Sequence, residues 1–503
     1  MKSRRFRFIC LALCLSLAIL HAAMAKDREP VIAIVGATLI DGNGGPPLED
    51  VTVIVTGNRI SAVGPRGSVQ VPKEARVING TGKFITPGFI DTNVHLSLYG
   101  AGETFVRYEN KNADLALEAA QLHLKYGITT VRDSYGSLLP LVEVRDAINR
   151  GEKIGARILA AGNIVGWGGP YSVTFSLTRE GELTLFQEQI NDFITQGAGE
   201  ELMDMELEAL RQAINRYLDK GPDFIKYGGT AHFSYPTLIG FSEDAQRVIV
   251  EEAHKRGKVA ETHSTSPEGL RISILAGIDL IQHPEVLPDK YPDALVELIR
   301  ERSVICSILS NTITGKVWEK HLKAKEERER KKAEAEKELA KEAKLKQRAK
   351  TSAELRKEYR EQDIGLEIRR FNAQKLIQSG CIVTVSTDNY LGQAPEFRRE
   401  PKPEHQEAGI GTIIAIEGMV ELGMTPAQAI VAATKNGAIA CRSLDQFGTV
   451  EKGKLADLLV FDADPLANIS NIRKISILIR DGKIIDRDKL PEKPVWYGRG
   501  GLK

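Results

Sequence analysis

Hydrophobic residues follow two different patterns along this chain. Near both ends they form short runs broken by turn residues, as in VIAIVGATLID and VTVIVTGNRISAVG after residue 30 and ISILIRDGKIID close to the end. Such runs are typical of short β-strands, and Asp481-Gly482 is a hairpin signal between two of them. We therefore predict a small β-sandwich built from both ends of the chain, residues 26–85 and 441–503.

Between these segments, strand-like runs alternate with helical stretches. This alternation predicts a parallel sheet, and eight repeats predict a closed (β/α)₈ TIM-like barrel of class α/β over residues 86–440. One helix is expected to begin at Pro426, because Thr425 and Gln428 have capping-box spacing. The eight strand-like runs end near His95, Arg132, Ala161, Tyr227, His263, His283, Leu309 and Asp388.

The segment 316–370 does not fit the barrel repeat. Its central part, 321–360, contains 15 Lys and Arg against 9 Asp and Glu, with no Gly or Pro. This composition favours helix, and Thr351 and Glu354 have capping-box spacing for a second helix. We predict a protruding charged helical hairpin inserted before the last barrel strand. It is a solvated projection, an arm that docks a partner, or an active-site lid.

The first 25 residues have the pattern of a secretory signal peptide. A basic start is followed by an apolar run over 9–20 and a small-x-small cleavage site at 23–25. The apolar run is short for a membrane span, and no other run is long and apolar enough for one. We therefore expect an exported protein, periplasmic or secreted, with no stable membrane span. The net charge of +1 gives no reason to expect a nucleic-acid partner.

Residues that bind metals stand at the ends of several predicted strands. His95 ends the first run, and Asn93, two residues earlier, faces the same side. His263 and His283 each close an apolar run, and Asp388 closes CIVTVSTD. Because the carboxyl ends of barrel strands converge, these residues are expected to meet at one site. Imidazole and carboxylate ligands suit Zn²⁺ or a similar divalent ion.

Lys226 is a charged residue that follows the apolar run Asp223-Phe224-Ile225. A buried lysine must shift its pKa, find a partner or be modified. Two residues near it, Tyr227 and His232, are expected to contact the substrate, because the loops that follow barrel strands build barrel active sites.

These motifs together resemble those of the amidohydrolase superfamily, especially its imidazolonepropionase-like and Xaa-Pro dipeptidase-like metal hydrolases. PGFIDTNVH resembles the first-strand motif PG-x-ID-x-H-x-H of the family. GITTVRD, DFIK, VAETH, IQH, STD and GKLADLLVFDADPL then follow in the order of the family, so that the resemblance covers nearly the whole mature chain.

The resemblance implies a metal-dependent amidohydrolase. His95 and Asp388 would hold one divalent ion, and His263 and His283 a second. Lys226, carboxylated by CO₂, would bridge the two ions. Asp388 would act as general base and then general acid for a metal-activated water. The substrate would be a small amide such as a dipeptide, an N-acyl amino acid or a cyclic amide, and the sequence leaves a homo-oligomer open.

Asn93 departs from the family motif, which has His at this position. An amide oxygen is a weaker ligand for zinc than imidazole. Three outcomes are open. Asn93 ligates through its oxygen and gives a looser two-metal site; a single ion remains on Lys226, His263 and His283; or hydrolysis is lost. The alternatives to an amidohydrolase are accordingly an esterase or lactonase on the same site, or a catalytically silent binding protein. A second departure is GWGGPYS, which has Pro170 and Tyr171 where related members often carry His.

Overall fold

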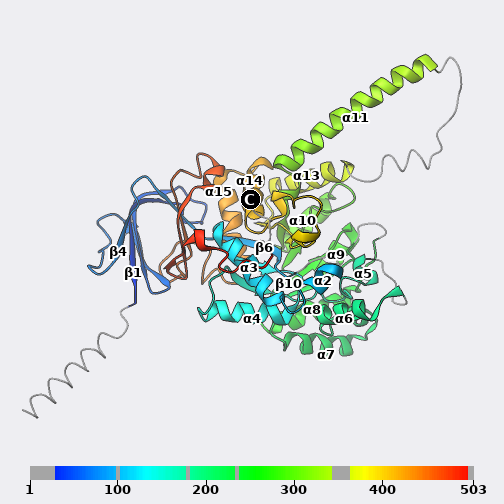
Figure 1. Ribbon diagram of the computed structural model, residues 1–503, viewed down its shortest axis with the longest axis horizontal. Coiled ribbons are helices and arrows are strands. Elements are labelled where there is room, and N and C mark those ends of the chain that lie inside the picture. Colours follow the sequence, from blue (N-terminus) through cyan, green and yellow to red (C-terminus); the bar gives the residue numbers. More distant parts are fainter. Residues whose placement is uncertain (1–28, 98–101, 177–181, 233–236, 343–362, 497–503) are drawn as a thin grey trace, which may run out of the picture.

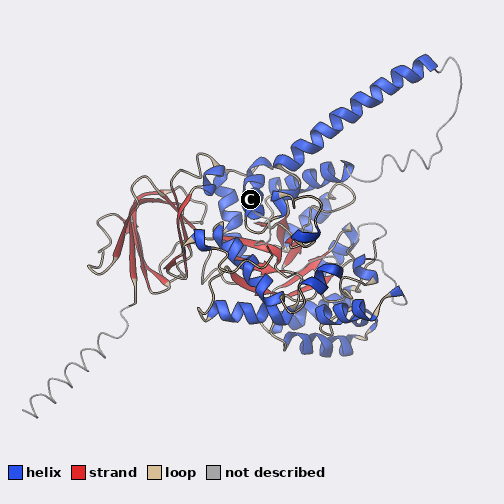
Figure 2. Cartoon of the chain, in the orientation of Figure 1, coloured by secondary structure: helices blue, strands red, loops and turns tan. Residues whose placement is uncertain are grey.

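The computed structural model describes residues 29–97, 102–176, 182–232, 237–342 and 363–496. It contains two bodies, a β-domain at one end and a larger α/β domain from which one helix projects (Figures 1 and 2). The predicted signal peptide lies outside the described residues. None of the helices in the described ranges is both long enough and apolar enough to cross a membrane.

The β-domain is one eight-stranded sheet that joins the two ends of the chain. Its strand order is β17-β16-β15-β5-β1-β2-β3, with β4 paired to β1. The junction is the antiparallel pairing of β5 with β15. The sheet curls around its own apolar core, which includes Ile34, Val53, Leu458 and Ile479. The strands are β1 (Val31–Leu39), β2 (Leu48–Thr56), β3 (Arg59–Pro65), β4 (Arg76–Asn79), β5 (Phe84–Pro87), β15 (Leu458–Phe461), β16 (Ile475–Arg480) and β17 (Lys483–Ile484).

The larger domain is a closed parallel barrel in which β13 and β14 are two parts of the eighth strand, and this confirms the predicted fold class. Two parallel sheets make it, β13-β12-β11-β10-β9 and β14-β6-β7-β8. A parallel bridge between Val165 and Tyr227 joins them on one side. On the other side the amide of Asp388 donates to the carbonyl of Asn93 at 2.9 Å. The strands are β6 (Phe89–His95), β7 (Ile128–Asp133), β8 (Arg157–Ala160), β9 (Ile225–Gly228), β10 (Ala260–His263), β11 (Leu280–Gln282), β12 (Ile305–Ile308), β13 (Val383–Val385) and β14 (Asn389–Tyr390).

Helices surround this barrel (Figure 2). The predicted capping box is confirmed: Thr425 accepts from the amide of Gln428, and Gln428 accepts from the amide of Thr425. The helix ends at Ala433, because the backbone leaves helical geometry at Thr434. The helices are α2 (Gly102–Arg107), α3 (Asn112–Lys125), α4 (Leu138–Asn149), α5 (Val173–Ser176), α6 (Leu185–Thr195), α7 (Leu207–Leu218), α8 (Glu243–Lys255), α9 (Pro267–Leu275), α10 (Asp293–Glu301), α11 (Gly315–Glu342), α13 (Asp363–Gln378), α14 (Ile410–Glu421), α15 (Pro426–Ala433) and α16 (Lys435–Ala440). Short 3₁₀ turns are Glu200–Asp204, Ser310–Thr312, Pro395–Phe397, Glu404–Gln406, Ile469–Arg473 and Arg487–Lys489.

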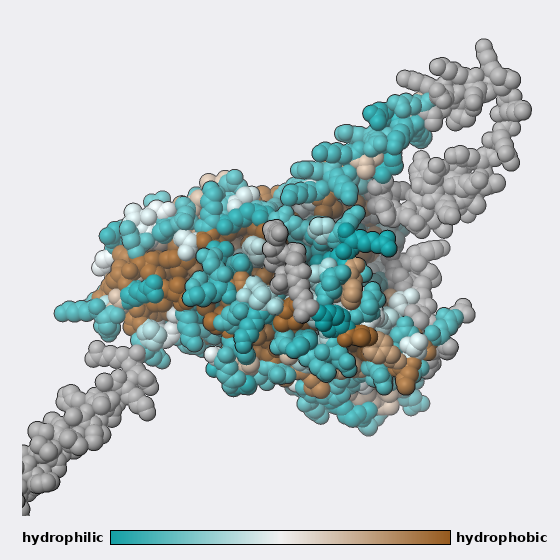
Figure 3. All heavy atoms as spheres, in the orientation of Figure 1, coloured by the Kyte–Doolittle hydropathy of each residue, from teal (hydrophilic) through white to brown (hydrophobic). Residues whose placement is uncertain are grey.

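Helix α11 is the projecting element, and its described surface is hydrophilic (Figures 1 and 3). Its base is fixed to α13, because Lys325 pairs with Glu367 at 2.6 Å and Arg370 lies over the Trp318 ring at 4.5 Å. The first helix of the predicted hairpin is therefore present. The predicted second helix start, at Thr351 and Glu354, lies outside the described residues.

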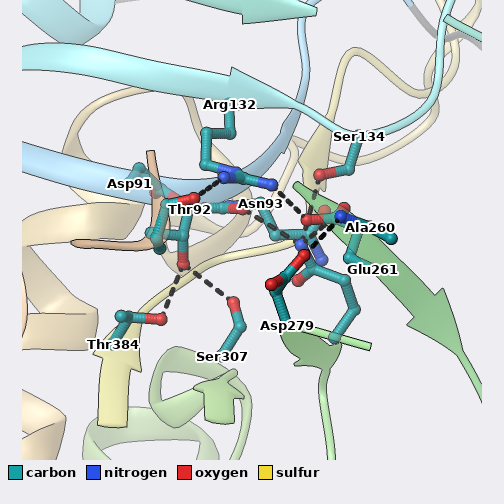
Figure 4. A network of polar contacts seen from close by, with 12 residues as sticks. Asp91, Thr92, Asn93, Arg132, Ser134, Ala260, Glu261, Asp279, Ser307 and Thr384 are labelled. Atoms are coloured by element: carbon teal, nitrogen blue, oxygen red, sulfur yellow. Dashed lines mark hydrogen bonds and ion pairs between the residues drawn. The ribbon is translucent and has the colours of Figure 1, made fainter. Parts of the chain in front are cut away.

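A buried ion pair lies inside the barrel. Arg132 of β7 and Glu261 of β10 are 2.5 Å apart, and both side chains are fully inaccessible. Gln282 also donates to Glu261 at 2.9 Å, and the Arg132 guanidinium stacks on Phe224 at 3.9 Å. Figure 4 shows this pair beside a second network, in which the Thr92 hydroxyl bonds those of Ser307 on β12 and Thr384 on β13. Polar side chains thus fill this part of the barrel interior, most of them paired with one another.

Replacing Arg132 is expected to destabilise the fold strongly. Arg132→Met would leave the carboxylate of Glu261 buried without its cation, which costs about 3–5 kcal/mol of unfolding free energy. The measurement is chemical denaturation followed by circular dichroism. Arg150→Met is the matched control, because the Arg150–Glu152 pair has side chains 59% and 55% exposed and its loss should leave the denaturation midpoint unchanged. Equal midpoints for the two variants would contradict the assignment.

Candidate metal and active site

The predicted ligands lie together at the carboxyl ends of the barrel strands. His95 is the last residue of β6, His263 is the last residue of β10, and Lys226 lies within β9. His283 follows β11 by one residue, and Asp388 follows β13 by three. Barrel closure therefore brings residues from five strands to one end.

The first group consists of Asn93, His95 and Asp388. Oδ1 of Asp388 lies 2.8 Å from His95 Nε2 and accepts from Asn93 Nδ2 at 3.0 Å. His95 Nδ1 lies 3.1 Å from the carbonyl oxygen of Tyr135. Since a carbonyl only accepts, Nδ1 is the ring donor in this contact, which turns Nε2 towards Asp388 and the site. His95 is thereby oriented as a ligand.

The second group is the histidine pair. Nδ1 of His263 and Nε2 of His283 are 3.1 Å apart. Two nitrogen ligands on a tetrahedral zinc ion are separated by about 3.3 Å, given bonds of about 2.0–2.1 Å. These two nitrogens thus have nearly the spacing that a shared ion requires. The opposite ring nitrogens, His263 Nε2 and His283 Nδ1, have no hydrogen-bond partner among the described residues.

Lys226 lies between the two groups. Its side chain is buried, and burial lowers the pKa of Lys226 below its ordinary value, although nearby Asp388 and Glu261 oppose the shift. Its charge also depresses the pKa of both His263 and His283, after the larger effect of burial. A lowered pKa gives the amine a larger neutral fraction, and the neutral amine is the form that reacts with CO₂. The environment of Lys226 therefore favours the chemistry that the family resemblance implies.

These residues fit a divalent ion, but the set includes an amide and a lysine besides the histidines and the carboxylate. Among the described residues, no three His, Cys, Asp or Glu side chains converge as a complete cage. The imidazoles and the carboxylate come instead as two pairs, and the remaining donors are Asn93 and Lys226. The buried Oδ1 of Asn93 accepts no hydrogen bond. Because a half-turn of the amide exchanges its oxygen and nitrogen, this unused oxygen can complete the first group.

Asp388 combines a charged state with access to solvent. Burial alone would raise the pKa of Asp388, but the hydrogen bond and charge of His95, with the charges of His283 and Lys226, hold it well below the usual range. Its side chain remains 38% accessible. His283 and Asp388 also adopt positive φ values, 37° and 53°. Non-glycine residues rarely do so, and such strain concentrates at functional sites.

The structure separates the two predicted substrate contacts. His232 lies near the site, because its pKa, which burial lowers, also responds to the charges of Asp388, Lys226 and His95. Tyr227 does not face the site: its hydroxyl donates to Gln246 of α8 at 2.9 Å. Neighbouring residues of a strand point to opposite faces, so Tyr227 must face the helices when Lys226 faces the interior. The sequence-based assignment of Tyr227 as a substrate contact is therefore wrong.

Aromatic residues beside the site were not predicted. Trp167 packs its ring against His263 with centroids 4.7 Å apart, and Phe175 stacks on His232 at 4.5 Å. Tyr135 meets the ring of His95 at 6.2 Å. The sequence signal that could have identified them is their position in the segments that follow the second and third barrel strands. Tyr171, one of the two residues of GWGGPYS that depart from the family pattern, is half-buried. Its backbone amide and carbonyl are hydrogen-bonded to the side-chain amide of Asn191.

Two surface hollows of about 460 and 400 Å³ lie elsewhere. They are lined by residues that precede strands β11, β12 and β13, among them Asp279, Ser303 and Cys381. They are therefore at the opposite end of the barrel from the ligands. None of the predicted site residues lines either hollow, so neither is the candidate active site.

Comparison with known proteins agrees with this arrangement. The model of the amidohydrolase family matches residues 84–485. Ochratoxinase of Aspergillus niger is 24% identical over 468 residues, which cover 89% of this chain and 84% of that relative. The solved structures of molinate hydrolase and phenylurea hydrolase B are each 30% identical with a TM-score of 0.79. Each alignment covers 93% of this chain, and 97% and 99% of the respective structure. The predicted resemblance is confirmed.

Restoring the histidine at position 93 is expected to strengthen metal binding. Asn93→His would place a second imidazole beside His95, and imidazole is a better zinc ligand than an amide oxygen, so the dissociation constant of the weaker ion should fall about tenfold or more. Equilibrium dialysis with Zn²⁺ measures it.

Asn43→His is the control for this change, because Asn43 is exposed on a loop of the β-domain. It adds a histidine without touching the site, and should leave zinc binding as in the unaltered protein. Equal zinc affinity for Asn93→His and Asn43→His would remove position 93 from the metal site.

Proposed function

The chain belongs to the amidohydrolase family, and we propose that it hydrolyses a carbonyl–nitrogen bond of a small molecule with the help of one or two divalent ions, most simply Zn²⁺. The observation that carries this proposal is the meeting of His95 and Asp388 with His263 and His283 around Lys226. These groups come from five strands and converge only because the barrel closes.

The residues have separate roles in this proposal. His263 and His283 hold one ion, because their facing nitrogens have the spacing of shared ligands. His95, Asp388 and the amide oxygen of Asn93 would hold the other, and Lys226, if carboxylated by CO₂, would supply an anionic ligand for both. A divalent ion, when bound, lowers the pKa of a coordinated water towards neutrality and polarises a carbonyl.

Asp388 is the proposed general base and acid. Both of its side-chain hydrogen bonds to described residues go to Oδ1, so Oδ2 is available to accept a proton. The low pKa of Asp388 keeps it ionised in the free protein. After it has taken a proton from the attacking water, it can return that proton to the leaving nitrogen, which would otherwise depart as an unstable anion.

The proposed substrate is an amide in the broad sense. A dipeptide or N-acyl amino acid was the expectation from the family resemblance. Two relatives at 30% identity are named for the hydrolysis of molinate and of phenylureas, which favours a non-peptide carbonyl–nitrogen bond. The signal-peptide pattern of the first 25 residues supports export to the periplasm or the medium.

A catalytically silent binding protein is the rival function. Asn93 favours it, since the weaker ligand stands where the family has histidine. The buried lysine and the two histidines argue against it, because burial of Lys226, His263 and His283 opposes the charged form of each. Burying such groups costs free energy, and a protein that only binds a partner has no reason to bury them.

Loss of the base is expected to abolish hydrolysis without unfolding the protein. Asp388→Asn keeps the size of the side chain but removes the proton acceptor, so kcat should fall by about 10²–10⁴. The measurement is hydrolysis of a panel of amides and phenylureas by protein supplied with Zn²⁺ and bicarbonate, with circular dichroism as the check on folding.

Asp293→Asn is the matched control, because the Asp293 carboxylate is 88% exposed on α10. It should hydrolyse the panel as the unaltered protein does. Hydrolysis of esters or lactones alone would favour the esterase alternative. Undiminished turnover by Asp388→Asn, or no turnover of any amide by the unaltered metal-loaded protein, would overturn the proposal.

A further inference from the structure

A cluster of aromatic rings borders the second metal group. Trp167, Phe175 and His232 are in mutual contact, with ring centroids 4.5 to 5.7 Å apart. Trp167 is edge-on to the ligand His263 at 4.7 Å, and His232 is 5.9 Å from the same ring. One side of the site is therefore built of flat side chains rather than of charged groups.

The backbone fixes this cluster in place. The indole nitrogen of Trp167 donates to the carbonyl of Thr230 at 3.1 Å. The ring lies so close to β9 that a Cβ on Gly228 would come within 2.2 Å of it, which explains why glycine follows Tyr227. The amide of His232 donates to the carbonyl of Thr174 at 2.8 Å. These hydrogen bonds join the loops that follow β8 and β9 and fix the positions of the rings relative to one another.

Accessible surface remains between the cluster and the proposed base. The side chain of Asp388 is 38% accessible although its pKa is governed by buried neighbours. His232 is exposed as well, and Phe175 is half-buried. Because the His232 ring lies 5.9 Å from that of His263, its open surface borders the same site.

Three exposed apolar residues lie in or beside the segments that carry Phe175 and His232. Val173 of α5 is 40% exposed, and Leu238 and Ile239 are 45% and 38% exposed. Leu238 accepts from the amide of Ala231 at 2.8 Å, directly before His232. Large apolar side chains left open to water often mark a route for a ligand or partner. Here they belong to the segments that carry Phe175 and that pair with the backbone before His232.

We propose that the Phe175–His232 pair, supported by Trp167, binds a flat, apolar aromatic ring of the substrate, so that the preferred substrates are amides that carry an aryl group. This inference rests on the proposed function. It goes further by assigning the ring-binding side chains and by choosing aryl amides over dipeptides. An aromatic ring gains from edge and face contacts with other rings, and an aliphatic ring of the same size does not.

The experiment compares two matched pairs of substrates. In one pair the same acid is joined to benzylamine or to cyclohexylmethylamine, and in the other the same amine is joined to phenylacetic or cyclohexylacetic acid. The two pairs cover both sides of the bond, and each partner differs only in the flatness of its ring. The quantity measured is the ratio of kcat/KM for the aromatic substrate to that for the cyclohexyl substrate.

Three variants test the ring contacts. His232→Ala alters an exposed residue and should fold, and Phe175→Leu keeps apolar volume but removes the ring. In at least one substrate pair, both should lower the ratio about threefold to tenfold relative to the unaltered protein. Phe193→Leu is the matched control, since Phe193 is 38% exposed on α6 and makes no contact with the cluster. Intrinsic reactivity cancels, because the same substrates are used throughout. An unchanged ratio in His232→Ala would overturn the proposal.

Failure of the proposed function would look different. If the unaltered metal-loaded protein hydrolyses no amide, the ring contact is tested by calorimetric binding of benzamide and cyclohexanecarboxamide. Tighter binding of benzamide, lost in His232→Ala, would uphold the aromatic contact even though hydrolysis had failed. Equal binding of both compounds would overturn it.

Discussion

The closing contact of the barrel, between the first strand and the end of the last, is the interaction on which the candidate site depends. The amide of Asp388 donates to the carbonyl of Asn93 at 2.9 Å, and the following strand β14 pairs in parallel with β6. These residues are 295 positions apart in the chain. Their meeting places the carboxylate of Asp388 against His95 and Asn93. Formation of the fold and formation of the first ligand group are therefore one event, and a barrel left open at this seam would have no site.

The site also places several ionisable side chains in the barrel interior, and neighbouring groups offset the effect of their burial. Glu261 is the register partner of Lys226 on the adjacent strand. Arg132 forms an ion pair with Glu261, so the carboxylate of Glu261 is not reserved for the Lys226 ammonium. The lysine is thereby left with a lowered pKa, and the pKa of each neighbouring histidine also lies below its ordinary value. These are the protonation states in which amine and imidazole bind metals or CO₂.

Much of this arrangement follows from local sequence patterns. The eight predicted strand ends agree closely with the observed ones, because an apolar run that stops at a polar residue marks where a barrel strand reaches the surface. Tyr227 was misplaced although the strand period already put it opposite Lys226. The aromatic cluster was missed for a different reason. His232 was predicted as a substrate contact, but its ring partners were not: Trp167 lies on a loop and Phe175 in the short helix α5. No period relates sequence position to direction there, so these contacts depend on tertiary structure alone.

Metal binding at the convergent residues is the central claim, and elemental analysis of the purified protein, prepared without chelators, tests it most directly. We predict at least one zinc-like ion per chain. This ion should be lost when His263 and His283 are both changed to alanine and the fold is retained. A protein with no bound metal after supply of Zn²⁺ and bicarbonate, or with the same metal content after both histidines are removed, would contradict it.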